Sequence, residues 1–203
     1  MTVVGPGGCG KTRLTIEAVR GRPAELQQGH PAATQSQECA PPAIRSPLHG
    51  FVELAAAGPA TDLVRAVRNA CGLREDVDLV TVLGEGLLVL DNCEHLRREV
   101  AALADALLRG CPELRILATS RVTLGVAGEV VLPLVGLDPA AGVALLYDRA
   151  RRVQPHLAEA DAAAGEICAL ADGLPLAVEL AAAPARGLPL SDIRDGMADR
   201  MRF

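Results

Sequence analysis

A glycine-rich segment near the start of the sequence contains the single lysine of the chain. Residues 5–12 read GPGGCGKT and match the pattern G-x-x-x-x-G-K-[ST], with a β-branched run before them and a stretch expected to be helical after them. Glycines let backbone N–H groups converge on a polyphosphate, and the first turn of a helix favours negative charge. The segment predicts a nucleotide-binding loop with these contact residues: Gly5, Gly7, Gly8, Cys9, Gly10, Lys11, Thr12 and Arg13.

The lysine is notable because the count of 20 Lys and Arg leaves 19 arginines beside it. A compact ammonium with three donors can bridge β- and γ-phosphate oxygens, whereas a planar guanidinium is too wide and too rigidly forked. We therefore expect Lys11 to bind the phosphates and the Thr12 hydroxyl to bind Mg²⁺. A merely flexible glycine-rich turn is the simpler alternative, and the strand and helix expected on either side count against it.

A second stretch ends in an acid that could share this metal. Residues 86–92, GLLVLDN, are a continuous apolar run, which is typical of a strand covered on both faces. A carboxylate at the end of such a strand can reach the metal beside a phosphate loop, so we expect Asp91 to be the second Mg²⁺ ligand. Asn92 stands where fast ATPases often carry a glutamate base, and Glu94 is the next acid, with a solvent-facing place at a helix start as its simplest interpretation. We therefore expect slow hydrolysis.

Two further stretches have polar or turn residues at the ends of expected elements. Residues 114–121 predict another buried strand and end in Arg121, whose charge could contact a γ-phosphate; a surface arginine after a strand is the alternative. Residues 172–183, DGLPLAVELAAA, predict that one helix stops at Gly173 and the next begins at Pro175. Taken alone, this last stretch predicts only packing.

The order of elements predicts an α/β fold. Apolar runs predict strands at 2–4, 51–54, 86–92, 114–121 and 129–134, and helical spacing predicts helices at 10–20, 62–71 and 96–110. Alternating strands and helices favour a parallel sheet with right-handed crossovers. After residue 137 we expect helices only, at 139–153, 160–171, 175–183 and 190–200. We therefore expect a nucleotide-binding α/β domain over 1–135, with a disordered insertion at 21–50, and a helical annex over 136–203.

Composition limits the classes of function. The net charge of −5 and the scattered basic residues disfavour direct DNA binding by this chain. The sequence shows no leader and no apolar run long enough for a bilayer, so we expect a cytoplasmic protein without membrane contact. The six cysteines form no C-x-x-C pair, which favours free thiols over disulfides or zinc.

Four stretches in this order, GPGGCGKTRL, LLVLDNCEHL, CPELRILATSR and DGLPLAVELAAA, resemble the NB-ARC-like ATPase module of STAND-class signalling proteins. The module is similar to that of large bacterial transcriptional regulators of the LuxR and antibiotic-regulator type. The resemblance implies a P-loop NTPase fold and a switch between ADP-bound and ATP-bound states, with self-association as output. By position, Lys11 and Thr12 match the phosphate loop, Asp91 the Walker B acid and Arg121 the sensor arginine, while Pro175 matches the proline that packs near the adenine.

The sequence also departs from that family. Residues 21–50 look unlike it, only about a dozen residues separate GLRED from LLVLDN where the family has a further helix, and the chain ends before the winged-helix domain. We therefore expect a truncated module that hydrolyses ATP weakly and exchanges ADP freely. Two alternatives stay open: a small-molecule kinase with lid arginines at 97–98 or 151–152, and a non-functional remnant.

Overall fold

The computed structural model describes residues 1–20, 48–58, 60–157 and 161–200. The chain divides into two compact units. The first consists of Met1–Val4 and Thr12–Leu132, and the second of Gly5–Lys11 and Pro133–Phe203.

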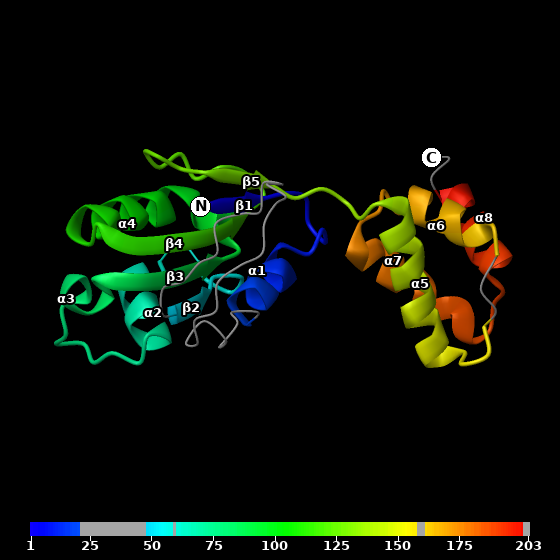
Figure 1. Ribbon diagram of the computed structural model, residues 1–203, viewed down its shortest axis with the longest axis horizontal. Helices are drawn as coiled ribbons and strands as arrows, with labels where there is room; N and C mark the ends of the chain where they lie inside the picture. Colours follow the sequence, from blue (N-terminus) through cyan, green and yellow to red (C-terminus); the bar gives the residue numbers. More distant parts are fainter. Residues whose placement is uncertain (21–47, 59, 158–160, 201–203) are drawn as a thin grey trace, which may run out of the picture. The chain divides into compact units, whose positions relative to one another are not determined.

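The first unit is built on a five-stranded sheet with the order β2-β3-β4-β1-β5 (Figure 1). The strands are β1 (Thr2–Val4), β2 (Leu48–Glu53), β3 (Glu85–Asp91), β4 (Glu113–Ser120) and β5 (Val131–Pro133). The pairs β2–β3, β3–β4 and β1–β4 are parallel, with Thr2 opposite Ala118 and Leu90 also opposite Ala118. Because parallel strands end on the same edge of a sheet, the polar residues that follow them are brought together there.

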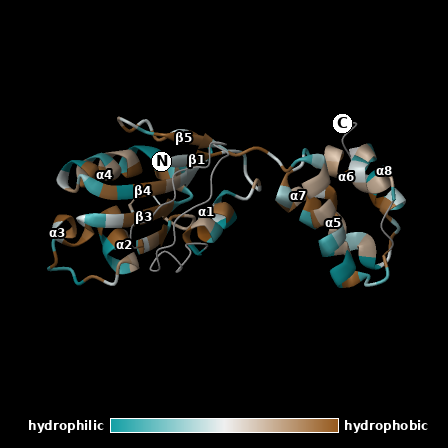
Figure 2. Ribbon diagram, in the orientation of Figure 1, coloured by the Kyte–Doolittle hydropathy of each residue, from teal (hydrophilic) through white to brown (hydrophobic). Residues whose placement is uncertain are grey.

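Strand β3 lies between β2 and β4 and is buried on both faces, as its apolar run predicts. Leu88 and Leu90 belong to the core formed with helices α2 (Leu63–Ala70), α3 (Leu79–Leu83) and α4 (Arg97–Gly110). Leu87 and Val89 point to the opposite face and are buried as well. Figure 2 shows hydrophobic and hydrophilic residues along α4, consistent with one face on the core and one in solvent. Covering both faces of β3 fixes the position of the acid at its end.

The second unit contains the helices α5 (Pro139–Val153), α6 (Ala163–Leu170), α7 (Pro175–Ala182) and α8 (Leu190–Arg200), with the 3₁₀ turn η3 (Ala183–Arg186). Asp138 caps α5, because its carboxylate accepts the amide N–H of Ala141, and Pro139 occupies the first turn. Leu146, Ile167 and Val178 are fully buried in a shared core.

Several predicted boundaries are corrected. β2 begins at Leu48, so the last three residues of the insertion predicted over 21–50 belong to a strand; residues 21–47 lie outside the described part of the chain. A short helix, α3, occupies the stretch between GLRED and LLVLDN where no helix was expected. Asp78 explains it, since its carboxylate accepts hydrogen bonds from the Val80 amide and the Thr81 hydroxyl. Helix α1 (Lys11–Arg20) starts one residue later than predicted.

Among the helices of the described residues, none combines the length and the apolar character needed to cross a membrane.

Candidate functional site

The carboxylate of Asp91 is the centre of a polar cluster at the carboxyl ends of β3 and β4. Thr12 Oγ1, from the first turn of α1, lies 2.8 Å from Asp91 Oδ1 and 3.0 Å from Oδ2. Thr119 Oγ1, near the end of β4, lies 2.6 Å from Asp91 Oδ1. Asp91 itself is buried. The structure thus brings together Thr12 and Asp91, which the sequence assigns to one metal ion although 79 positions separate them.

The residue after Asp91 turns the chain away from the sheet. Asn92 has φ 64°, in the left-handed region that asparagine tolerates better than most side chains. Its amide N–H donates to Thr119 Oγ1 at 2.8 Å. From there the chain enters the 3₁₀ turn η2 (Cys93–Leu96). Thr119 therefore fixes two consecutive residues of the neighbouring strand end, a role that the sequence analysis missed.

The glycine-rich segment Gly5–Lys11 lies in the second unit and is organised around its lysine. Lys11 Nζ lies 2.8 Å from both the Gly5 and the Pro6 carbonyl oxygens and 4.0 Å from the Cys9 sulfur. The ammonium is buried, and its small size lets it sit among these groups. Lys11 is followed directly by Thr12, so the two predicted ligands of phosphate and metal are consecutive in α1.

Two glycines of the loop adopt backbone conformations that other residues avoid. Gly8 has φ 78° and Gly10 has φ 94°. A side chain at Gly8 would also lie 3.0 Å from Leu176 Cβ. The shape of the loop therefore requires glycine at positions 8 and 10. Gly7 and Arg13 are both exposed.

The DGLPL stretch contacts the loop within the second unit. The Leu176 amide donates to the Gly8 carbonyl oxygen at 3.2 Å. Pro175, the first residue of α7, has its Cγ 3.9 Å from where a side chain on Gly10 would begin. By itself the stretch predicts only packing, and the structure shows that it packs against the glycine-rich loop. The adenine contact assigned to Pro175 by resemblance stays a prediction.

Arg121 lies at the end of β4 and is paired with an acid. Its Nε is 3.0 Å from Glu94 Oε1. The Arg121 side chain is 64% exposed and that of Glu94 is 20% exposed. Glu94 therefore does not face solvent freely, contrary to the simplest interpretation of its position in the sequence.

Comparisons with known proteins give relatives for the whole chain. No protein-family model matches it. The "Putative HTH-type transcriptional regulator Rv0890c" of Mycobacterium tuberculosis is 39% identical over 100% of this chain and 22% of its own length. The "Uncharacterized protein Rv0894" of the same organism is 37% identical over 100% of this chain and 50% of its own length. The chain is thus similar to part of a protein named as a transcriptional regulator.

A comparison of folds agrees with the predicted α/β fold class. A chain in a structure of Drosophila ORC bound to DNA superimposes with a TM-score of 0.60 at 16% sequence identity, over 100% of this chain and 60% of that one. At this identity the likeness concerns the fold alone. Together with the parallel sheet and its flanking helices, it supports the predicted α/β fold class.

The thiol beside the cluster is not a nucleophile. Burial and the nearby carboxylates of Asp91 and Glu94 raise the pKa of Cys93 to about 12. Its Sγ lies 3.3 Å from the Leu90 carbonyl oxygen, to which it donates. Cys93 thus stays protonated at neutral pH and serves packing. The five cysteines within the described residues are free, and Cys39 lies outside them.

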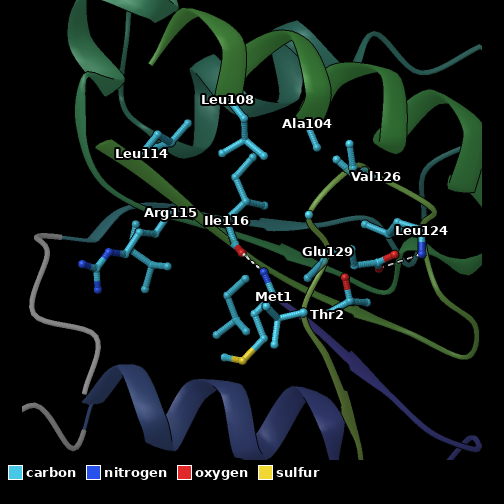
Figure 3. Close-up of a pocket in the computed structure, with 16 residues that line it drawn as sticks. Met1, Thr2, Ala104, Leu108, Leu114, Arg115, Ile116, Leu124, Val126 and Glu129 are labelled. Carbon is cyan, nitrogen blue, oxygen red and sulfur yellow. Dashed lines mark hydrogen bonds between the residues drawn. The ribbon is translucent and has the colours of Figure 1, made fainter. Parts of the chain in front are cut away.

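A cavity of about 340 Å³ lies away from the cluster, on the amino-terminal side of β1 and β4 (Figure 3). Its walls are mainly apolar and include Leu108, Leu114 and Ile116. Asp91, Thr119 and Arg121 do not line it, because they stand at the opposite ends of the strands. The cavity therefore is not the predicted nucleotide site.

Proposed function

We propose that this chain is an ATP- and ADP-binding switch module of a transcriptional regulator, with Mg²⁺ as cofactor and slow ATP hydrolysis. One observation carries the proposal: the Thr12 hydroxyl, directly after the phosphate-loop lysine, hydrogen-bonds to the buried carboxylate of Asp91. A hydroxyl and a carboxylate within hydrogen-bond distance are oxygen donors that one Mg²⁺ ion can share.

The residues of the cluster fit a magnesium ion. The donors are hard oxygens, which Mg²⁺ prefers over nitrogen or sulfur. Thr119 holds one carboxylate oxygen of Asp91 in place, so that the acid is oriented before any ligand arrives. When bound, the metal would neutralise charge on the β- and γ-phosphates. Thr12 and Asp91 would hold it.

The loop lysine supports the same proposal. In this structure the ammonium of Lys11 interacts with two carbonyl oxygens of its own loop, at Gly5 and Pro6. Neutral carbonyl oxygens attract a cation less strongly than phosphate oxygens do, because only the phosphate oxygens carry negative charge. A nucleotide phosphate can therefore replace them.

The similarity to a regulator supports the finer parts of the proposal. We assign the chain to the NB-ARC-like class, with nucleotide-binding residues over 1–135 and a helical part over 136–203. The named relative is a transcriptional regulator of which the chain spans 22%. We propose that other parts of such a regulator contact DNA, that this module works in the cytoplasm, and that self-association transmits its nucleotide state.

The test is nucleotide binding by the purified chain. We expect ATP with Mg²⁺, and ADP, to raise the unfolding midpoint, because a ligand at 100 times its Kd stabilises the folded state by about 2.7 kcal/mol. For a chain of this size that is a shift of roughly 5–10 °C. Lys11→Ala is the matched control and should abolish the shift. A parent protein whose midpoint does not move with any nucleotide would contradict the proposal.

A further inference from the structure

The ion pair between Glu94 and Arg121 joins two strand ends beside the polar cluster around Asp91. Glu94 lies in the first turn of η2, three residues after Asp91, and Arg121 directly follows β4. Arg121 Nε donates to Glu94 Oε1 at 3.0 Å. Both charged groups therefore stand at the sheet edge that carries Asp91, where a ligand of an α/β sheet binds.

The second carboxylate oxygen of Glu94 is unusual. Within the described residues, Glu94 Oε2 is buried from solvent and has no hydrogen-bond partner. A buried acceptor without a partner is unfavourable, so such groups generally point to a bound water or ligand. Glu94 Oε1 thus accepts a hydrogen bond from Arg121, while Oε2 is available to accept one from a bound water or ligand.

Neighbouring residues cannot take this role. Asn92, at the position where many ATPases carry a glutamate, has an amide side chain that does not accept a proton. Asp91 already accepts hydrogen bonds from Thr12 and Thr119. Glu94 is the remaining carboxylate of this strand end.

We propose, on the basis of the function above, that Glu94 is the general base for ATP hydrolysis and that Arg121 restrains it. The oxygen of a water molecule bonds to the γ-phosphorus while the bond from that phosphorus to the β,γ-bridging oxygen breaks. The bridging oxygen leaves with the electron pair as part of ADP. The proton of the water passes to Glu94 Oε2 and later to solvent, which leaves inorganic phosphate.

The restraint depends on the nucleotide. The Arg121 side chain is mostly exposed, and exposed ion pairs contribute little free energy, so the guanidinium can leave Glu94 easily. The γ-phosphate of ATP offers more negative charge than one carboxylate and attracts Arg121 away. ADP lacks this phosphate, so the ion pair forms again. Glu94 is therefore released from Arg121 only while the triphosphate is bound.

The first experiment separates binding from chemistry. Glu94→Gln keeps the size of the side chain but cannot accept a proton. Its affinity for ATP with Mg²⁺, measured with a fluorescent analogue, should stay within about threefold of the parent, while single-turnover hydrolysis falls by about 100-fold or more, the usual contribution of a general base. Glu99→Gln, an exposed acid in the first turn of α4, is the matched control and should change neither value.

A rescue experiment excludes a purely structural role. In Glu94→Ala, added formate should restore part of the hydrolysis rate, because a small carboxylate can occupy the space of the missing one. Formate should not accelerate Glu94→Gln, whose amide fills that space. A Glu94→Gln variant that hydrolyses ATP within threefold of the parent would overturn the inference. So would a parent protein that binds ATP without any hydrolysis, whereas a parent that binds no nucleotide contradicts the proposed function itself.

The role of Arg121 has its own measurement. Arg121→Ala should leave the Kd for ADP unchanged and lower the preference for ATP over ADP by about tenfold, the loss of one charge-assisted contact. Arg109→Ala, another exposed arginine that pairs with an acid, is the control and should leave the ratio unchanged. An unchanged ratio in Arg121→Ala would overturn the restraint.

Discussion

Thr119 Oγ1 donates a hydrogen bond to Asp91 Oδ1 at 2.6 Å and accepts one from the Asn92 amide at 2.8 Å. One buried hydroxyl of β4 thereby fixes the last residue of β3 and the first residue after it. The adjacent strand therefore holds the proposed metal ligand in place together with Thr12, whose hydroxyl contacts both oxygens of the same carboxylate.

Replacing Thr119 with valine tests this link. Thr119→Val keeps the shape of the side chain but leaves the Asn92 amide without its partner, which costs about 1–3 kcal/mol of the free energy of unfolding. It also removes one of the two hydroxyls that hold the Asp91 carboxylate, so affinity for ATP with Mg²⁺ should fall by about tenfold. Urea unfolding and calorimetric titration measure the two effects. Thr123→Val, at an exposed position, should cost less than about 0.5 kcal/mol; equal costs would contradict the assigned role.

The single lysine leads to a second prediction. Lys11→Arg should lower the affinity for ATP and for ADP by about 10- to 100-fold, because losing a charge-assisted contact costs about 1.5–3 kcal/mol of binding free energy. The buried ammonium lies 2.8 Å from two loop carbonyl oxygens, and a wider guanidinium does not fit among them. Titration calorimetry gives both constants. Arg20→Lys, the reverse substitution at the exposed end of α1, is the control and should leave both affinities unchanged. Parent-like affinity in Lys11→Arg would refute the assignment of Lys11 to the phosphates.

Much of the fold could be predicted because its signals are local. Continuous apolar residues identified β3 and β4, and Asp138 followed by proline identified the start of α5. The position of Asp91 at the end of a buried strand could be predicted as well, because a few consecutive residues show an apolar run that ends in an acid. Its proximity to Thr12 then followed from the glycine-rich pattern and the parallel sheet.

Other features depend on residues far apart in the sequence. The pairing of Glu94 with Arg121 and the two bonds of Thr119 require the register of β3 against β4, which no local pattern encodes. α3 was missed for a different reason. Its five residues are too few for a helical period to appear, and only the cap at Asp78 signals it.

Asp91 should act through the metal. Asp91→Asn keeps an oxygen ligand but removes a negative charge, so we expect ATP with Mg²⁺ to bind about 10- to 100-fold more weakly. ADP binding in the presence of EDTA should change by less than about threefold, since no metal is involved. Asp105→Asn, on the α4 surface and paired with Arg109, serves as the control. Equal losses with and without Mg²⁺ would show that Asp91 is structural.

A fourth prediction concerns stability and acid. One carboxylate oxygen of Glu129 accepts the Leu124 amide at 2.9 Å (Figure 3), and the other accepts the Gly125 amide at 2.8 Å. Burial acts to raise the pKa of Glu129, but these bonds and one from the Thr2 hydroxyl outweigh it and lower the pKa below the ordinary 4.5. The folded state therefore binds this proton more weakly than the unfolded state does.

The sign of the pH effect follows from that difference. The carboxylate stabilises the fold fully above the ordinary pKa of glutamate, and this contribution is lost as the pH falls through the lower pKa of the folded state. Glu129→Gln should therefore cost about 1 kcal/mol at pH 7, the net value of one hydrogen bond. Its deficit relative to the parent should shrink as the pH falls below 4.5. Urea unfolding between pH 3 and pH 7 measures both, with the exposed Glu113→Gln as control. A deficit that stays constant over this range would mean that the charge of Glu129 contributes nothing.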